Sequence, residues 1–211
     1  VELHFEVFHD YLEMHPFFRH YAKKNPAGMR NICHLAVSRM NASEGDVIFS
    51  TGEVSEDQMM YFCVSGCLCY SIGGKENKFL EEEDWLNEAV LWTEWQQIGA
   101  LKAVEDCVMI CIHVKPFLKV VDKYKTKHFY PAAYARRFIS ELNMQERDCI
   151  SEIFDDFIDI DTVAEEVFKP KKEEGARKTF RRMSSNLSKF LNQGKFGGDS
   201  KAKGDVPRTT V

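Results

Sequence analysis

Hydrophobic positions near the start of the chain recur at helical spacing. One helical face is predicted to carry Leu3, Val7, Phe8, Tyr11 and Leu12. Residues three and four positions apart lie on the same side of a helix, so this pattern favours an amphipathic helix. Pro16 and Pro26 each suit the first turn of a further helix. The first forty residues are therefore predicted to form three short helices packed against another part of the chain.

Between Met40 and His113 the pattern changes to short apolar runs separated by glycine-containing turns. The predicted strands include residues 47–49, 60–64, 67–72, 100–103 and 108–112. Turns are expected at Gly45, Gly52 and Gly66, and at the Gly73-Gly74 pair. Short strands at this density are typical of a barrel or jelly roll. The predicted class is α+β, with an eight-stranded, jelly-roll-like β-roll flanked by N-terminal and C-terminal helices.

After His113 the helical period returns. Helices are predicted to follow Pro116 and Pro131, and the second of them would carry Tyr134 and Phe138. A third helix is predicted where apolar residues fall at positions i, i+3, i+4, i+7 and i+8, namely at Ile150, Ile153, Phe154, Phe157 and Ile158. Thr162 and Glu165 have the spacing of a capping box and predict a last short helix that ends at Phe168.

Composition and charge divide the chain further. The 211 residues, 44% of them hydrophobic, suffice for one domain with extensions. From residue 169 onward there are 12 Lys and Arg against 4 Asp and Glu, so residues 1–168 hold 16 against 29. We expect a linker-like helical segment (1–38), the roll with its closing helices (39–145), acidic helices (146–168) and a basic, largely disordered tail (169–211). The tail suits an anionic membrane surface, whereas the acidic body does not suit nucleic acid.

Metal binding and catalysis find little support in the sequence. The seven cysteines lie among apolar neighbours without a CxxC pair, which favours buried, reduced thiols over a metal cluster. The acidic run of Asp155, Asp156, Asp159 and Asp161 is interpreted as a solvated helix face, because the spacing of a calcium loop is missing. No nucleophile elbow, phosphate loop or zinc-protease motif occurs. We expect neither an enzyme nor a metal site; a cupin-like, metal-dependent enzyme is the alternative from another class.

The order of these anchors resembles a known family. Five features carry this resemblance: the turn and strand at 45–48, the Gly52-Glu53 pair, the aromatic strand at 60–62, Glu88 and the strand at 99–103. They have the spacing found in the cyclic-nucleotide-binding domain. Residues 2–37 are similar to the end of the helical linker before this domain in cyclic-nucleotide-gated, hyperpolarisation-activated and ether-à-go-go-type potassium channels. Helix-Pro-Phe junctions like His15-Pro16-Phe17-Phe18 also precede the domain in kinase regulatory subunits.

The resemblance implies a phosphate-binding cassette between residues 83 and 103. In the family, the amides of a short helix and an arginine hold the nucleotide's phosphate, and a glutamate accepts from the ribose hydroxyl. Here Glu88 and the helix beginning at Ala89 remain, but Gln97 stands at the arginine's position, followed by Ile98, and Asn87 replaces a glycine. A charged hydrogen bond contributes ~1.5–3 kcal/mol, and an unpaired buried charge costs ~3–5 kcal/mol. Affinity for cAMP or cGMP is therefore expected to be low, by roughly two to three orders of magnitude.

The resulting hypothesis is a non-catalytic regulatory domain on the cytoplasmic side of a cation (potassium) channel, joined to a pore and linker and assembled as a homo-tetramer. The alternative is a genuine cAMP or cGMP receptor resembling a kinase regulatory subunit. In related ether-à-go-go-type domains the pocket is filled by the chain itself. Trp85, Trp92 and Trp95 are expected to plug the pocket or to form a platform for a flat ligand. Ser184, after Arg181-Arg182-Met183, is a predicted phosphorylation site.

Overall fold

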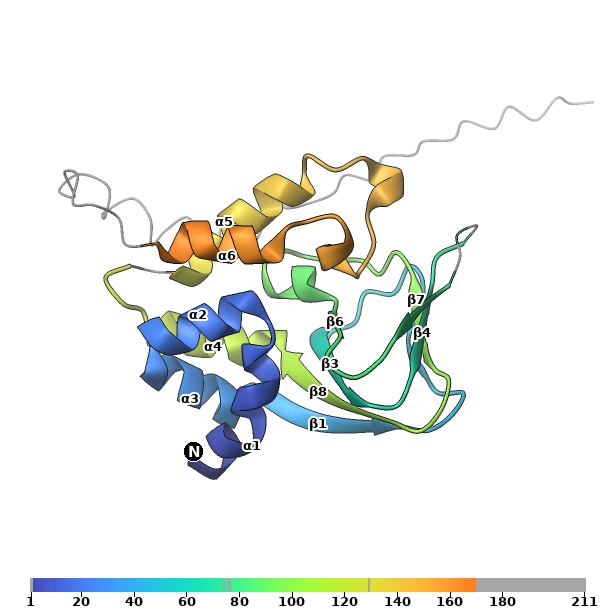
Figure 1. Ribbon diagram of the computed structural model, residues 1–211, viewed down its shortest axis with the longest axis horizontal. Coiled ribbons are helices and arrows are strands. Elements are labelled where there is room, and N and C mark those ends of the chain that lie inside the picture. Colours follow the sequence, from blue (N-terminus) through green and yellow to red (C-terminus); the bar gives the residue numbers. More distant parts are fainter. Residues whose placement is uncertain (1, 74, 76, 129, 170–211) are drawn as a thin grey trace, which may run out of the picture.

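The computed structural model describes residues 2–169, except for 74, 76 and 129. Its helices gather on one side of the molecule and its strands on the other (Figure 1). The helices are α1 (Glu2–Glu13), α2 (Pro16–Lys24), α3 (Pro26–Leu35), α4 (Val114–Lys123), α5 (Tyr130–Leu142) and α6 (Ile160–Phe168), and the short 3-10 helices are η1 (Glu88–Leu91), η2 (Arg147–Cys149) and η3 (Phe154–Asp156). The predicted α+β class is confirmed.

Local chemistry sets the starts of α2 and α3. Pro16 and Pro26 occupy the first helical turns, where a missing N–H leaves no hydrogen bond unmade. The side chain of His15 caps α2 by accepting a hydrogen bond from the backbone N–H of Phe17 (3.2 Å). Asn25 caps α3 by accepting from Gly28 N–H (3.0 Å), and its amide also donates to the carbonyl of Tyr124 at the end of α4 (2.7 Å). The caps thus tie the first helices to the later ones.

Two antiparallel sheets of four strands face each other. The strands are β1 (Val37–Ala42), β2 (Val47–Phe49), β3 (Met59–Ser65), β4 (Leu68–Ser71), β5 (Lys78–Leu80), β6 (Trp85–Leu86), β7 (Ala100–Ala103) and β8 (Cys107–His113). Their orders are β1-β8-β3-β6 in one sheet and β2-β7-β4-β5 in the other. The strands follow the predicted segments closely, although β1 begins at Val37, ahead of the expected change of pattern at Met40. A single eight-stranded roll stays a prediction.

The molecule has two hydrophobic cores. The sandwich core lies between the sheets and includes Tyr61 and Met109 of one sheet and Tyr70 and Leu101 of the other. The helical core joins all six α-helices and η1 to the outer face of β3 and β8. Aromatic side chains fill the helical core; Phe17, for example, contacts the rings of Trp92 and Tyr134, with centroids 5.0 and 4.8 Å away. The cassette therefore lies where the two cores meet.

Two local predictions are wrong. Residues 150–158 do not form an α-helix; they run as an extended segment interrupted by the 3-10 turn η3. The apolar side chains of this segment divide between the two cores, which an α-helix could not achieve with these positions: Ile153 enters the sandwich core, and Ile150, Phe154 and Ile158 enter the helical core. The last helix is capped by Asp159, which accepts from Thr162 N–H (2.8 Å), so Thr162 lies inside α6 instead of capping it.

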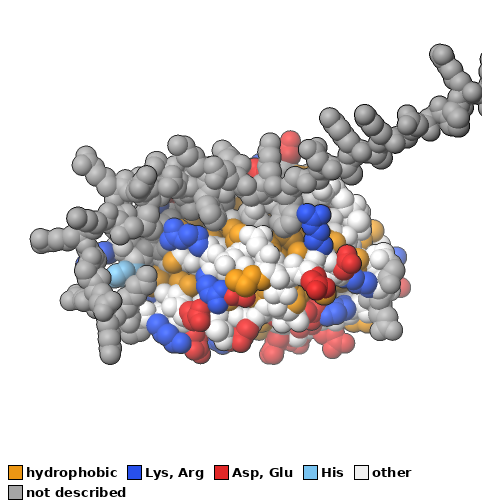
Figure 2. Space-filling model, turned by 90° about the horizontal axis from the view of Figure 1, so that it is seen from above, with side chains coloured by type: hydrophobic (Ala, Val, Ile, Leu, Met, Phe, Trp, Pro, Cys, Tyr) orange, Lys and Arg blue, Asp and Glu red, His pale blue; other side chains and the backbone are white. Residues whose placement is uncertain are grey.

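The surface formed by residues 2–169 carries many charged side chains (Figure 2). Acidic side chains gather along the lower edge of the face shown in Figure 2, in line with the excess of Asp and Glu in residues 1–168. No helix in the described ranges is both long and apolar enough to cross a membrane. The predicted disordered tail beyond residue 169 and the predicted phosphorylation site Ser184 lie outside the described residues. The predicted domain boundaries likewise stay predictions.

Candidate functional site

The cassette begins with a change of backbone direction at Asn87. This residue has a left-handed backbone (φ 68°, ψ 29°), directly between β6 and η1. Asparagine tolerates that region better than most residues other than glycine. The Asn87 amide donates to the carbonyl of Met59 on β3 (2.8 Å), which holds the turn against the sheet. The turn sends Glu88 and Ala89 into the interior, where both are fully buried.

The cassette encloses the side chain of Glu152, a residue of the extended segment after α5. One carboxylate oxygen, Oε1, accepts hydrogen bonds from the indole N–H of Trp95 (2.9 Å) and the backbone N–H of Ile98 (2.6 Å). The other, Oε2, accepts from the backbone N–H of Gly99 (3.1 Å) and from the hydroxyl of Tyr70. Glu152 is 0% exposed. The Glu152 carboxylate therefore accepts four hydrogen bonds, three of them from residues 95–99 and one from Tyr70 of β4.

Tyr70 and Gly99 shape this site. The Tyr70 hydroxyl donates to the carboxylate of Glu152 and accepts from the backbone N–H of the same residue (3.2 Å). Burial, and then the negative charge of Glu152, raise the pKa of Tyr70, which keeps its proton in place for donation. A Cβ at Gly99 would lie 2.5 Å from the Tyr70 ring. A glycine is thus required where the backbone passes under this ring.

The segment around Glu152 is held by more than its carboxylate. Its backbone carbonyl accepts from the N–H of Asn87 (2.7 Å), so the segment also caps the turn before η1. Ile153 lies in the sandwich core, while Phe154 packs edge-on against Trp95 (5.5 Å between centroids) and Phe138 of α5 (5.3 Å). Polar and apolar contacts therefore fix the same few residues, and the carboxylate enters in one position.

The site is an anion cradle without a cation. Its four donors, two backbone amides, an indole and a phenol, match the roughly four lone-pair positions of a carboxylate. Hydrogen bonds to a charged group contribute ~1.5–3 kcal/mol each, and that is what offsets the cost of burying Glu152. Because none of the four donors carries a positive charge, the cradle suits a singly charged carboxylate better than a phosphate that would need a guanidinium.

The predicted cassette residues take different positions. The backbone N–H of Ile98 is one of the four donors to Glu152, but the side chain of Gln97 is not among them. Gln97 is buried, its Oε1 has no hydrogen-bond partner, and its backbone pairs with the turn at Gly52 and Glu53. The side chain at the arginine's expected position therefore makes no hydrogen bond to Glu152, whereas the two backbone amides that follow it do.

The three tryptophans contact different neighbours. Trp95 binds Glu152 as described, and Trp92 packs in the helical core against Phe17. Trp85 contacts the ring of His15 edge-on (5.2 Å between centroids). Trp92 and Trp95 are nearly fully buried, at 3% and 5% exposure. Trp92 and Trp95 are therefore core residues, and the partly buried Trp85 packs against the same core.

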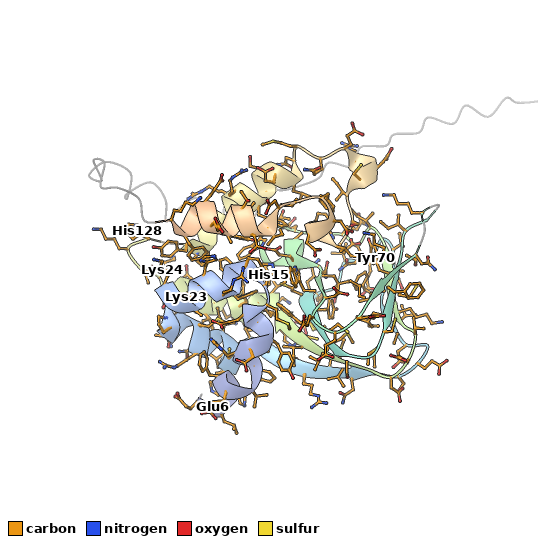
Figure 3. The ribbon with its side chains drawn as sticks, in the orientation of Figure 1. Glu6, His15, Lys23, Lys24, Tyr70 and His128 are labelled. Atoms are coloured by element: carbon orange, nitrogen blue, oxygen red, sulfur yellow. The ribbon has the colours of Figure 1, made fainter. Side chains whose placement is uncertain are left out.

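Glu88 faces away from Glu152, towards the helices. Its Oε1 accepts from the indole N–H of Trp92 (2.9 Å), and its Oε2 lies 3.1 Å from His15 Nε2. Tyr134 of α5 is also adjacent: burial and then the charge of Glu88 raise the pKa of its hydroxyl well above the usual value. In the view of Figure 3, η1 lies between the labelled His15 and Tyr70. Two buried glutamates therefore meet at the cassette: Glu88 at the start of η1, turned to the helices, and Glu152, which enters from the later segment.

Sequence reasoning missed Glu152. The sequence predicts an acidic helix here, in which a single glutamate between Ser151 and Ile153 would be solvent-exposed. The available signal was its place in the apolar run from Ile150 to Ile158, since an unpaired carboxylate is rarely buried without donors. Within the described ranges, no group of three or more His, Cys, Asp or Glu side chains is arranged to hold a metal ion.

Comparisons with known proteins give matches of structure alone. No protein-family model and no curated protein matches the sequence. The chain is similar to the sensor domain of the transcriptional regulator DNR from Pseudomonas aeruginosa, at 17% identity and a TM-score of 0.49 over 67% of this chain and 96% of that one. It is also similar to the C-linker/CNBHD of zELK channels, at 16% identity and a TM-score of 0.40 over 47% of this chain and 56% of that one.

Proposed function

We propose that this chain is a non-catalytic regulatory domain related to cyclic-nucleotide-binding domains, whose pocket is closed by its own Glu152 and does not respond to cAMP or cGMP. The observation that carries the proposal is the fully buried carboxylate with four donors from the cassette and β4. A nucleotide phosphate held at position 97, where the family has its arginine, would lie beside the Ile98 and Gly99 amides that Glu152 already occupies. Binding would therefore require the segment to leave first, which lowers the apparent affinity.

The cellular setting is part of the same proposal. The similarity of residues 2–37 to a channel linker supports a place on the cytoplasmic side of a membrane, attached to the pore of a tetrameric cation channel. A function without bound nucleotide fits the cassette, because Gln97 supplies no positive charge. We infer that the domain acts through contacts between its helices and the rest of such a channel, and that the docked segment keeps the cassette in one conformation.

Calorimetric titration with cAMP and with cGMP tests the proposal. The unmodified chain should show no saturable binding up to about 1 mM nucleotide. Gln97→Arg alone should raise the nucleotide affinity only slightly, because Glu152 still occupies the amides of Ile98 and Gly99. The double variant Gln97→Arg/Glu152→Ala should bind at least about tenfold more tightly than Gln97→Arg, since the competing carboxylate is gone.

Glu146→Ala is the matched control. Glu146 is an exposed carboxylate six positions earlier on the same segment. In the Gln97→Arg background it should leave nucleotide binding unchanged. Micromolar binding by the unmodified chain would contradict the proposal and favour a genuine nucleotide receptor.

A further inference from the structure

A second buried cluster connects the cassette to the first helices. Three polar atoms meet beside η1: Oε2 of Glu88, Nε2 of His15 and the hydroxyl of Tyr134. All three are sealed from solvent, and none has a well-aligned hydrogen bond, although His15 Nε2 and Glu88 Oε2 are 3.1 Å apart. Buried polar atoms almost always find aligned partners, so a group of three without them calls for an explanation.

The protonation of His15 follows from its role as a cap. Its Nδ1 accepts a hydrogen bond from the N–H of Phe17, so the ring proton is on Nε2, which lies 3.1 Å from Glu88 Oε2 without an aligned hydrogen bond. The other neighbours of Glu88, the indole of Trp92 and the hydroxyl of Tyr134, are also donors. Groups that can donate thus surround Glu88 from three elements, the start of α2, the end of η1 and α5, and of these the Trp92 indole makes an aligned hydrogen bond with it.

The same short cassette also carries the contacts to Glu152. Asn87, directly before Glu88, donates its N–H to the Glu152 carbonyl, and Trp95, three residues after Trp92, donates to the carboxylate. A continuous path of short contacts therefore runs from the segment at 150–158, through η1 and Glu88, to His15 and α2. A path of this kind carries coupling only if a change at one end alters the stability of the other.

We propose that the contact of Glu88 with His15 transmits the docking of the Glu152 segment to α2, so that occupancy of the pocket sets the stability of the first helices. This inference rests on the proposed function, because it takes the docked segment as the regulating state. His15 and Glu88 are positioning residues in this account: neither contacts a ligand. When the segment leaves, η1 loses its fixed position, the Glu88 carboxylate moves away from His15, and the first turn of α2 loosens.

Amide hydrogen exchange on the full chain, followed by mass spectrometry, tests the coupling. Glu152→Gln should speed exchange both in the 150–158 segment and in α2, the latter by about tenfold, the scale of a coupling between sites. His15→Asn removes the contact with Glu88 while its side-chain oxygen still caps α2. In the His15→Asn background, Glu152→Gln should speed exchange at 150–158 and add no further change in α2.

Two additional variants keep the test decisive. Ala22→Gly weakens the same helix about two turns away from His15 and leaves the Glu88 contact in place, so α2 should still respond to Glu152→Gln. Ile153→Ala releases the segment through its apolar anchor and repeats the test without relying on the carboxylate. An equal response of α2 with and without His15→Asn would overturn the inference. A 150–158 segment that ignores Glu152→Gln but responds to Ile153→Ala would instead count against the proposed function.

Discussion

Replacing Glu152 by glutamine removes the charge and preserves the shape. Glutamine has one acceptor oxygen and one amide group that donates, so it can satisfy at most one of the two pairs of donors. If the glutamine oxygen faces Trp95 and Ile98, the glutamine NH2 group faces the backbone N–H of Gly99. Two donors then face each other and cannot form a hydrogen bond. Two charge-assisted hydrogen bonds are then lost, at ~1.5–3 kcal/mol each, with partial recovery when Tyr70 rotates to accept. We expect a loss of ~2–4 kcal/mol in the free energy of unfolding.

Urea denaturation followed by tryptophan fluorescence measures this loss, and Glu146→Gln is the control of equal charge change on the exposed part of the segment. Surface substitutions usually change stability by less than ~0.5 kcal/mol, so the two variants should be clearly separated. The denaturation midpoint should fall for Glu152→Gln with an unchanged slope. Equal midpoints for Glu152→Gln, Glu146→Gln and the unmodified chain would refute the argument that the carboxylate holds the segment.

Three further predictions concern other parts of the structure. Gly99→Ala should cost ~1–3 kcal/mol because its Cβ would overlap the buried Tyr70 ring, whereas Gly73→Ala, with open space around it, should be nearly neutral in the same denaturation assay. Burial raises the pKa of three thiols from 9.0 to about 12 (Cys33, Cys63 and Cys111). Because their folded pKa values lie above the unfolded ones, these three thiols should not change stability below pH 9 and should lower it by up to ~4 kcal/mol per pH unit above pH 9. A chain with all three changed to Ala should show a shallower fall between pH 9 and 10, before the buried tyrosines, whose pKa values are also raised, add their own dependence. The hydrogen bonds from Thr162 lower the pKa of Asp159, so its capping of α6 is fully present above the ordinary aspartate pKa and is lost as pH falls through the lowered pKa. Hydrogen exchange of the α6 amides should therefore show this helix fraying in acid. Asp159→Ala should remove that pH dependence.

Much of the fold could be predicted because local pattern and tertiary packing agree. The strand at Ala100–Ala103 and the helices opened by Pro16 and Pro26 follow from turn chemistry and apolar spacing. The prediction failed for residues 150–158, where the spacing of apolar residues matched a helix. Periodicity shows which residues are buried but not whether they enter the same core, and here Ile153 and Phe154 enter different ones.

The candidate site could be predicted only in part, because local spacing relates residues that are close together in the sequence. Asn87, Glu88 and Ile98 could be placed in a cassette by their spacing, and the absence of an arginine at Gln97 indicated weak phosphate binding. The group that fills the cassette lies more than 50 positions later in the chain than Ile98. No local signal relates a single glutamate to amides at that separation, because the contact exists only once the helices and sheets have packed.

The central claim is that the Glu152 carboxylate occupies the cassette. Its most direct test is an NMR measurement of the amide proton shifts of Ile98 and Gly99 and the indole proton shift of Trp95, in the chain with and without Glu152→Gln. Protons that are hydrogen-bonded to a carboxylate resonate downfield. We predict that all three signals lie downfield in the unmodified chain and move upfield together in Glu152→Gln, while the shift changes in Glu146→Gln are negligible. Signals that keep the same position in both chains would show that the carboxylate does not occupy the cassette and would contradict the account.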